Sequence, residues 1–186
     1  VTIQPVNDPP AITESDPVEK TMSEDGVPVA FSLTLNATDI DGDTLTWSIL
    51  TPATHGTATA TGTGLSKAIA YDPDADYHGS DSFVVQVSDG NGGTDSITVN
   101  VTINAENDAP VFTEIDPVGV IMSEDGTPTA FNLTLNATDA EGNTITWSIL
   151  TQGLHGTATA SGTGTSKVIG YTPAADYHGS DSFVVQ

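Results

Sequence analysis

The sequence contains no cysteine and only three lysine and arginine residues, against 25 aspartate and glutamate residues. Without cysteine there is no disulfide framework and no thiol chemistry. A chain with a formal net charge of −22 is repelled by nucleic-acid phosphates and by anionic membrane surfaces. Aromatic residues make up only 6% of the chain, and no apolar run is long enough to cross a bilayer. The composition therefore argues against nucleic-acid binding and membrane insertion.

So acidic a chain is either disordered or folded with its charge neutralised by cations. Hydrophobic residues make up 37% of the sequence, and they alternate with polar residues in strand-like runs, which favours a folded chain. Carboxylate and carbonyl oxygens are the ligands that calcium prefers in proteins. We therefore predict Ca²⁺ as the cofactor.

An internal repeat organises the whole sequence. Asn7–Pro10 returns as Asn107–Pro110, and Ser23–Gly26 returns as Ser123–Gly126. The offset is 100 residues throughout, without insertion or deletion, and roughly 70% of the aligned positions are identical. Near-identical copies in tandem indicate a recent duplication inside an array.

The two copies differ at their ends. Residues 87–103 have no counterpart after Gln186, whereas Val1–Gln4 matches Val101–Asn104. Either the chain is a window from a longer array, or it is a subunit whose missing last strand comes from a neighbour. We predict a first repeat over residues 1–104, of which 1–10 are the tail of a preceding repeat and a linker. A second, truncated repeat should cover residues 105–186.

Each repeat has the period-2 apolar pattern of β-strands, and helix signals are absent. Seven short strands in about 100 residues predict an all-β fold, an immunoglobulin-like sandwich in each repeat. They are expected near 18–22, 28–36, 44–49, 56–61, 66–71, 82–87 and 96–103. Trp47 and Trp147 lie in the third strand, where they could stack on sugars. A tryptophan packed between the two sheets is the interpretation that we favour.

Acidic residues concentrate in the turns between these strands. Asp39-Ile40-Asp41-Gly42-Asp43 follows the second strand, and Asp139-Ala140-Glu141-Gly142-Asn143 follows its copy. Oxygen ligands at alternate positions around such a turn can converge on one ion. Each repeat also carries Ser-Glu-Asp-Gly and opens with Asn-Asp-x-Pro, and Val87–Gly90 contains Asp89. Together these turns predict a metal site.

The sequence resembles the cadherin-like repeats of large bacterial surface adhesins and, more distantly, cadherin ectodomains. The resemblance rests on Glu24 in MSEDGVP, on Ala37–Asp43, on Tyr77–Phe83 leading into VSDGNGG, and on Ala105–Pro110. It implies calcium at the junction between successive repeats, which stiffens that junction. Its implied ligands there are Glu24, Asp76, Asp81, Glu106, Asn107, Asp108, Asp139 and Glu141. At the upper end of the first repeat they are Asn7, Asp8, Asp39, Asp41 and Asp89, a partial site.

Catalysis is not expected. His78 lies beside Asp81 and Ser82, but this tight loop lacks a nucleophile elbow and an oxyanion loop. Zinc is disfavoured because the histidines lack paired spacing. We expect a secreted, calcium-rigidified spacer of a cell-surface adhesin or stalk, with neighbouring repeats as its partners. The alternatives are a polysaccharide-binding module and a strand-donating subunit of an extracellular filament, which would exchange strands with adjacent copies.

Overall fold

The alternating apolar residues of the first repeat form two sheets that face each other across one core. This computed structural model describes residues 1–127 and 129–186, and the chain divides into two units, Val1–Glu106 and Asn107–Gln186. In the first unit one sheet has the order β1-β3-β7-β5. Its strands are β1 (Ala11–Ile12), β3 (Leu33–Thr38), β7 (Ser66–Pro73) and β5 (Gly56–Thr59).

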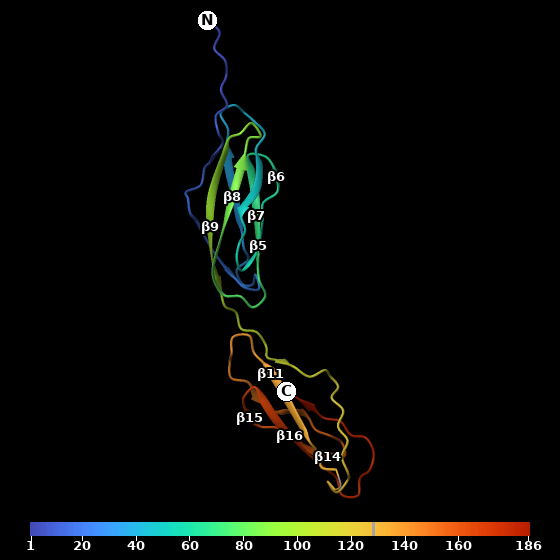
Figure 1. Ribbon diagram of the computed structural model, residues 1–186. Coiled ribbons are helices and arrows are strands. Elements are labelled where there is room, and N and C mark those ends of the chain that lie inside the picture. The colour runs from blue at the N-terminus through green and yellow to red at the C-terminus, as the bar shows by residue number, and fades with distance from the viewer. Residues whose placement is uncertain (128) are drawn as a thin grey trace. The chain divides into compact units, whose positions relative to one another are not determined.

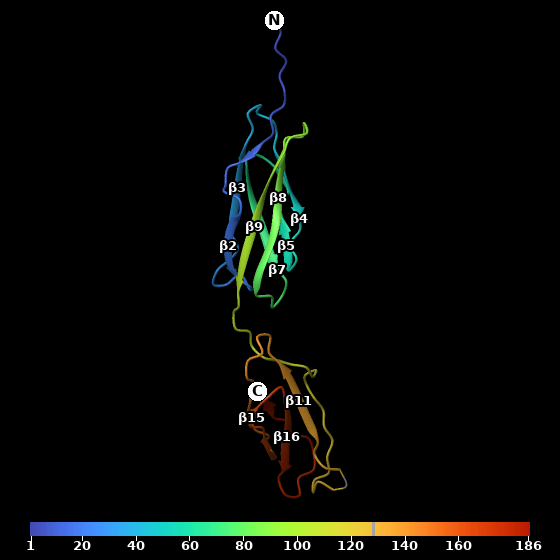
Figure 2. The same cartoon turned by 60° about the vertical axis from the view of Figure 1, so that its left-hand side comes forward.

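The second sheet of the first unit has the order β2-β9-β8-β4-β6. Its strands are β2 (Val18–Ser23), β9 (Thr94–Asn104), β8 (Gly79–Ser88), β4 (Thr46–Thr51) and β6 (Gly62–Thr63). Figure 2 shows β2, β9 and β8 next to one another. β9 lies between β2, which it pairs in parallel, and β8, which it pairs antiparallel. The last strand of the repeat is therefore central to this sheet.

The core of the first unit confirms the interpretation of the tryptophan. Trp47 is 1% exposed, and its indole N–H donates to the carbonyl of Gly64 at 2.8 Å. It packs with apolar side chains from both sheets, including Leu35, Phe83 and Val99. Trp147 is also buried, and its indole N–H donates to the carbonyl of Gly164. The buried side chain with one satisfied polar atom is the expected state of a sandwich tryptophan.

One expected strand is shorter than its sequence pattern. The alternation over residues 28–36 predicts a strand that begins near Pro28, but β3 begins at Leu33. Val29 instead returns to the end of β2, where its carbonyl accepts the N–H of Ser23 at 2.8 Å. Its side chain is consequently exposed. The loop between β2 and β3 is closed by this hydrogen bond. The Val29 carbonyl is therefore not available for pairing in a longer β3.

The second unit repeats the first sheet but has only fragments of the second. Its four-stranded sheet has the order β10-β11-β16-β14, and two small pairs are β12-β15 and β13-β17. The strands are β10 (Val111–Phe112), β11 (Leu133–Thr138), β12 (Thr146–Trp147), β13 (Ile149–Thr151), β14 (Gly156–Thr159), β15 (Gly162–Thr163), β16 (Ser166–Pro173) and β17 (Val184–Val185). β11, β14 and β16 appear together in Figure 1. Within the described residues 1–127 and 129–186, no helix could span a membrane. The predicted all-β fold with two tandem sandwiches is confirmed.

Candidate metal centre

The acidic turn after β3 gathers three carboxylates at one end of the first unit. Asp39 Oδ1 accepts the backbone N–H groups of Asp41 at 3.0 Å and Asp43 at 3.1 Å, which curls the turn around it. One carboxylate oxygen from each of the three residues lies within 4.8 Å of the others. Asp39 Oδ2 is buried and accepts no hydrogen bond. Such an atom is costly unless a cation or another donor meets it, so the turn is suited to a cation.

The segment that leads into the first unit is tied to this acidic turn. The Asp8 N–H donates to Asp41 Oδ2 at 2.8 Å, and the Asn7 side-chain amide donates to Asp89 Oδ2 at 2.7 Å. A Cβ at Gly93 would lie 2.7 Å from the Cα of Pro9 and would overlap the Asp89 carboxylate. Glycine at position 93 therefore permits this close approach. Five residues singled out in the sequence, Asn7, Asp8, Asp39, Asp41 and Asp89, come together at this end.

Asp89 is held as a carboxylate by its surroundings. The Asn7 amide, together with the N–H groups of Asn91 and Gly93, holds the pKa of Asp89 below its ordinary value in spite of burial. Hydrogen bonds to the charged form of a carboxyl favour that form. Asp89 thus contributes a negative charge to this end of the repeat at neutral pH.

Two further residues belong to the same group and were not assigned from the sequence. The Asn91 side-chain amide donates to Asp43 Oδ2 at 2.9 Å. Asp43 continues the series of aspartates at alternate positions that begins with Asp39 and Asp41. That spacing was a usable signal for Asp43. Asn91 could not be found in the same way, because only the fold brings its loop to the turn.

The second unit repeats the connection between linker and turn with changed residues. The Asp108 N–H donates to Glu141 Oε2 at 3.0 Å, and the Asn143 amide donates to Asn107 Oδ1 at 3.0 Å. Asp139 Oδ1 accepts the N–H of Asn143 at 2.7 Å. The longer glutamate takes the place of Asp41 without loss of the contact to the linker. The same local arrangement is therefore built twice.

The opposite end of the first unit brings Glu24 and Glu106 together. Glu24 is 7% exposed, and its Oε1 accepts the N–H of Glu106 at 2.8 Å. Ser23 Oγ donates to Glu106 Oε1 at 2.7 Å. Glu24 Oε2 is buried without a hydrogen bond, and the imidazole Nδ1 of His78 lies 3.9 Å from it. A buried carboxylate oxygen in this state is a second candidate contact for a cation.

Asp76 and Asp81 do not share the environment of the other candidates. Asp76 is exposed in a turn with a φ of 58°. Asp81 is buried, and each of its oxygens accepts two hydrogen bonds, from the N–H groups of Thr54, His55 and Ser82 and the hydroxyl of Tyr71. The resemblance assigned Asp81 to the metal. Its lone pairs are already used by protein donors, so we remove it from the ligand set.

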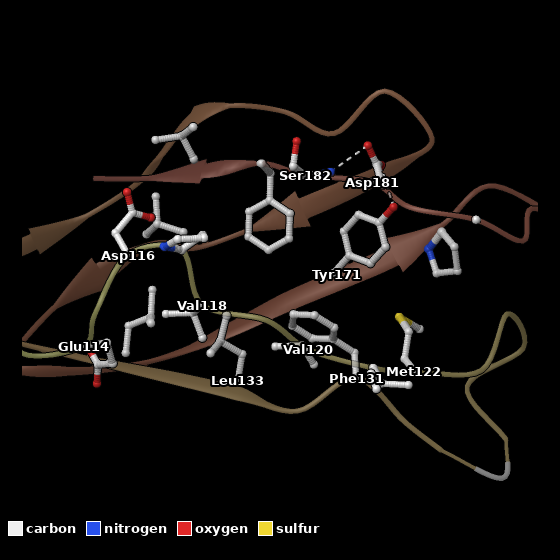
Figure 3. A pocket seen from close by; sticks show the side chains of 18 of the residues that line it. Glu114, Asp116, Val118, Val120, Met122, Phe131, Leu133, Tyr171, Asp181 and Ser182 are labelled. Carbon is white, nitrogen blue, oxygen red and sulfur yellow. Dashed lines mark hydrogen bonds between the residues drawn. The ribbon is translucent and has the colours of Figure 1, made fainter.

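Asp181 in the second unit accepts the same set of hydrogen bonds as Asp81, and this network makes the stability of the second unit depend on pH. Figure 3 shows Tyr171 and Ser182 on either side of the Asp181 carboxylate. The Tyr171 hydroxyl and the N–H groups of His155, Leu154 and Ser182 lower the pKa of Asp181 to about 2, although burial opposes them. Burial and the same carboxylate raise the pKa of Tyr171 to about 12.

Acid should therefore weaken the second unit. An unfolded aspartate has a pKa of about 3.9, so the depressed folded pKa stabilises the unit above about pH 4. That contribution is lost as pH falls through about 2. We expect urea unfolding, followed by amide signals of residues 107–186, to show this loss. Asp181→Asn should flatten the acid dependence, whereas the exposed Asp176→Asn should retain it; equal slopes in both variants would contradict the assignment.

The sequence pattern of bacterial Ig domains matches residues 7–102 and again residues 107–186. The chain belongs to the bacterial Ig domain family. Both matches fall within the two structural units. Bacterial Ig domains are typically extracellular and non-enzymatic modules. No curated protein sequence matches the chain.

Solved structures similar to this bacterial Ig chain include cadherin repeats and part of a hydrolase. The protocadherin gammaB7 EC3-6 cis-dimer structure is 16% identical with a TM-score of 0.45, over 96% of this chain and 47% of that chain. Human CDH23 EC21-23 is 20% identical with a TM-score of 0.48, over 92% and 56%. Endo-fucoidan hydrolase MfFcnA4 from glycoside hydrolase family 107 is 21% identical with a TM-score of 0.43, over 98% and 27%. The chain thus spans about half or less of the length of these proteins.

Proposed function

We propose that this pair of bacterial Ig repeats is a calcium-rigidified spacer of an extracellular, cell-surface adhesin or stalk. The main support for this proposal is the cluster of acidic residues at one end of the first unit. There Asp39, Asp41 and Asp43 place carboxylate oxygens within 4.8 Å of one another, and Asp39 Oδ2 is buried without a hydrogen bond. Three such oxygens repel one another unless a cation lies among them.

The donor set fits calcium better than a transition metal. Every candidate ligand in this group is a carboxylate or amide side chain, and no histidine or cysteine takes part. Hard cations take oxygen ligands, and calcium tolerates irregular sets of six to eight of them. Asn7, Asp8 and Asp89 would supply further oxygens, with Asn7 turning its amide oxygen toward the ion. When bound, calcium would supply positive charge that offsets the repulsion.

We propose the same role for the residues on either side of the connection between the repeats. Glu24 and Glu106 lie together at the end of the first unit. Along the chain follow Asn107 and Asp108, which are tied to Glu141 and Asn143 in the second unit. Asp139 completes that group. Without the ion, repulsion between these carboxylates would favour a bent connection that moves them apart. Calcium would bind the ordered connection and stabilise it by mass action.

The test of the spacer is a comparison of the solution dimensions of the chain. Small-angle scattering in calcium should give a larger maximum dimension than scattering in chelator, because a bent connection shortens the particle. Asp139→Asn keeps an oxygen for the N–H of Asn143 but removes a charge, so it should lose the calcium response. Asp176→Asn is the matched control and should keep it. Equal dimensions of the unmodified chain in calcium and in chelator would refute the spacer.

The polysaccharide-binding alternative receives no support from the tryptophans. Trp47 and Trp147 are both buried, so neither offers a ring to a sugar. Sugar stacking requires an exposed aromatic face. We therefore retain the spacer.

A further inference from the structure

The loop between β8 and β9 presents Asn91 and Gly92 in an open position. Both residues are exposed. A Cβ at Gly90 or at Gly92 would meet no atom within 4 Å, so the space around the loop is free. The two glycines have φ values of 80° and 109°, in the region that glycine adopts without strain. The fold therefore favours a glycine directly after Asn91 and leaves room around the pair.

This pair distinguishes Asn91 from the other asparagines of the sequence. Of the nine asparagines, only Asn91 precedes a glycine. The side-chain Cγ of an asparagine can be attacked by the backbone nitrogen of the next residue, and a side chain on that residue hinders the attack. Glycine has no Cβ, so its nitrogen can approach closely. Asn143 and Asn107, which belong to the corresponding group in the second unit, are followed by threonine and aspartate, and both are hindered.

We propose that Asn91 is a site of spontaneous deamidation, and that the reaction adds a carboxylate to the acidic end of the first unit. The Gly92 nitrogen bonds to Cγ of Asn91, and the bond from Cγ to the side-chain nitrogen breaks. That nitrogen leaves as ammonia and takes the proton of the Gly92 N–H with it. Water then opens the resulting succinimide ring at either carbonyl, which gives aspartate or isoaspartate. Because adjacent residues react, the step is intramolecular and needs no further reactant than water.

The contact that Asn91 makes gives the reaction a structural consequence. Its side-chain amide donates to Asp43 Oδ2 at 2.9 Å. Asp43 in turn lies with Asp39 and Asp41 in the group whose carboxylate oxygens are within 4.8 Å of one another. After deamidation a carboxylate stands in place of the donor, so the hydrogen bond is lost and two like charges face each other. The attraction between the loop and the acidic turn becomes a repulsion, unless a cation lies between them.

The new carboxylate also offers one more oxygen ligand to a cation at the acidic turn. This consequence rests on the proposed function, whereas the deamidation itself does not. One further negative charge near the ion should raise the calcium affinity of the first unit about 5- to 10-fold, even through a water-like dielectric. Deamidation would thus make the first repeat less stable without calcium and bind calcium more tightly.

Peptide mapping by mass spectrometry tests the modification. The 186-residue chain is incubated in mildly alkaline buffer without calcium, and samples are taken over time. The peptide that contains Asn91 should gain the mass difference between OH and NH₂ and contain isoaspartate. Asn91 should convert at least about 10-fold faster than Asn143 and Asn107, which are the internal controls. Asn91→Gln should abolish the change, because the larger ring closes more slowly. Equal rates at the three asparagines would overturn the proposal.

Asn91→Asp makes the aspartate product directly and tests the consequence. In chelator it should melt below the unmodified chain, and in titration calorimetry it should bind calcium about 5- to 10-fold more tightly. Ala70→Asp adds the same charge at an exposed position on β7 and should leave the affinity unchanged. Unchanged affinity of Asn91→Asp would refute the added ligand. An unmodified chain that binds no calcium would refute the proposed function, while the mass change at Asn91 would still establish the deamidation.

Discussion

Replacing Asp81 by alanine is expected to destabilise the first repeat by about 3–5 kcal/mol. The change leaves the N–H groups of Thr54, His55 and Ser82 and the hydroxyl of Tyr71 without their acceptor. Each buried donor that loses its partner costs about 1–3 kcal/mol, and water entering the site recovers part of that. Losses of this size are diagnostic of a broken buried network. Urea unfolding followed by the amide signals of residues 1–106 measures the effect.

The control for this change is Asp72→Ala, an exposed position on β7, which should cost no more than about 0.5 kcal/mol. The measurement also separates the two interpretations of Asp81. If Asp81 is a structural acceptor, the stability lost on its replacement by alanine should be equal in calcium and in chelator. If Asp81 is a metal ligand, the stability lost on the same replacement should be larger in calcium. A calcium-dependent difference would restore Asp81 to the ligand set.

The fold could be predicted from the sequence because its signals are local or periodic. The period-2 runs, the position of Trp47 and the 100-residue repeat are all visible without coordinates. β3 begins five residues later than its pattern because Val29 bonds back to Ser23. A contact of that kind depends on how two strands meet in space, and alternation does not report it.

The acidic residues show the same limit more sharply. Sequence spacing identified Asp39 and Asp41, which lie on one turn. It could not separate Asp81 from them, because an aspartate at the start of a strand can face solvent or the core. Thr54 and Tyr71, both distant in sequence, decide that question by donating to it. Asn91 joins the acidic end for the same reason, through a contact to Asp43 across 48 positions.

Calcium is expected to raise the melting temperature of the first repeat by about 10–20 °C at a calcium concentration 100 times the dissociation constant. Binding to the folded state alone contributes about 2.7 kcal/mol at that ratio. For a domain of about 100 residues, each kcal/mol shifts the midpoint by about 4–8 °C. Asp39→Asn should abolish most of the shift. Differential scanning calorimetry in calcium and in chelator gives both values.

Asparagine at position 39 separates loss of the ion from loss of the turn. Its side-chain oxygen can still accept the N–H groups of Asp41 and Asp43, as Asp39 Oδ1 does. Its amide replaces Oδ2, the buried oxygen that accepts no hydrogen bond, and an amide nitrogen repels a cation. In chelator the variant should therefore melt at or above the temperature of the unmodified chain, because one repulsive charge is gone. Asp72→Asn, at an exposed position on β7 that belongs to no candidate ligand set, should retain the full calcium shift. A large fall in stability of Asp39→Asn in chelator would show that Oδ2 serves the fold itself.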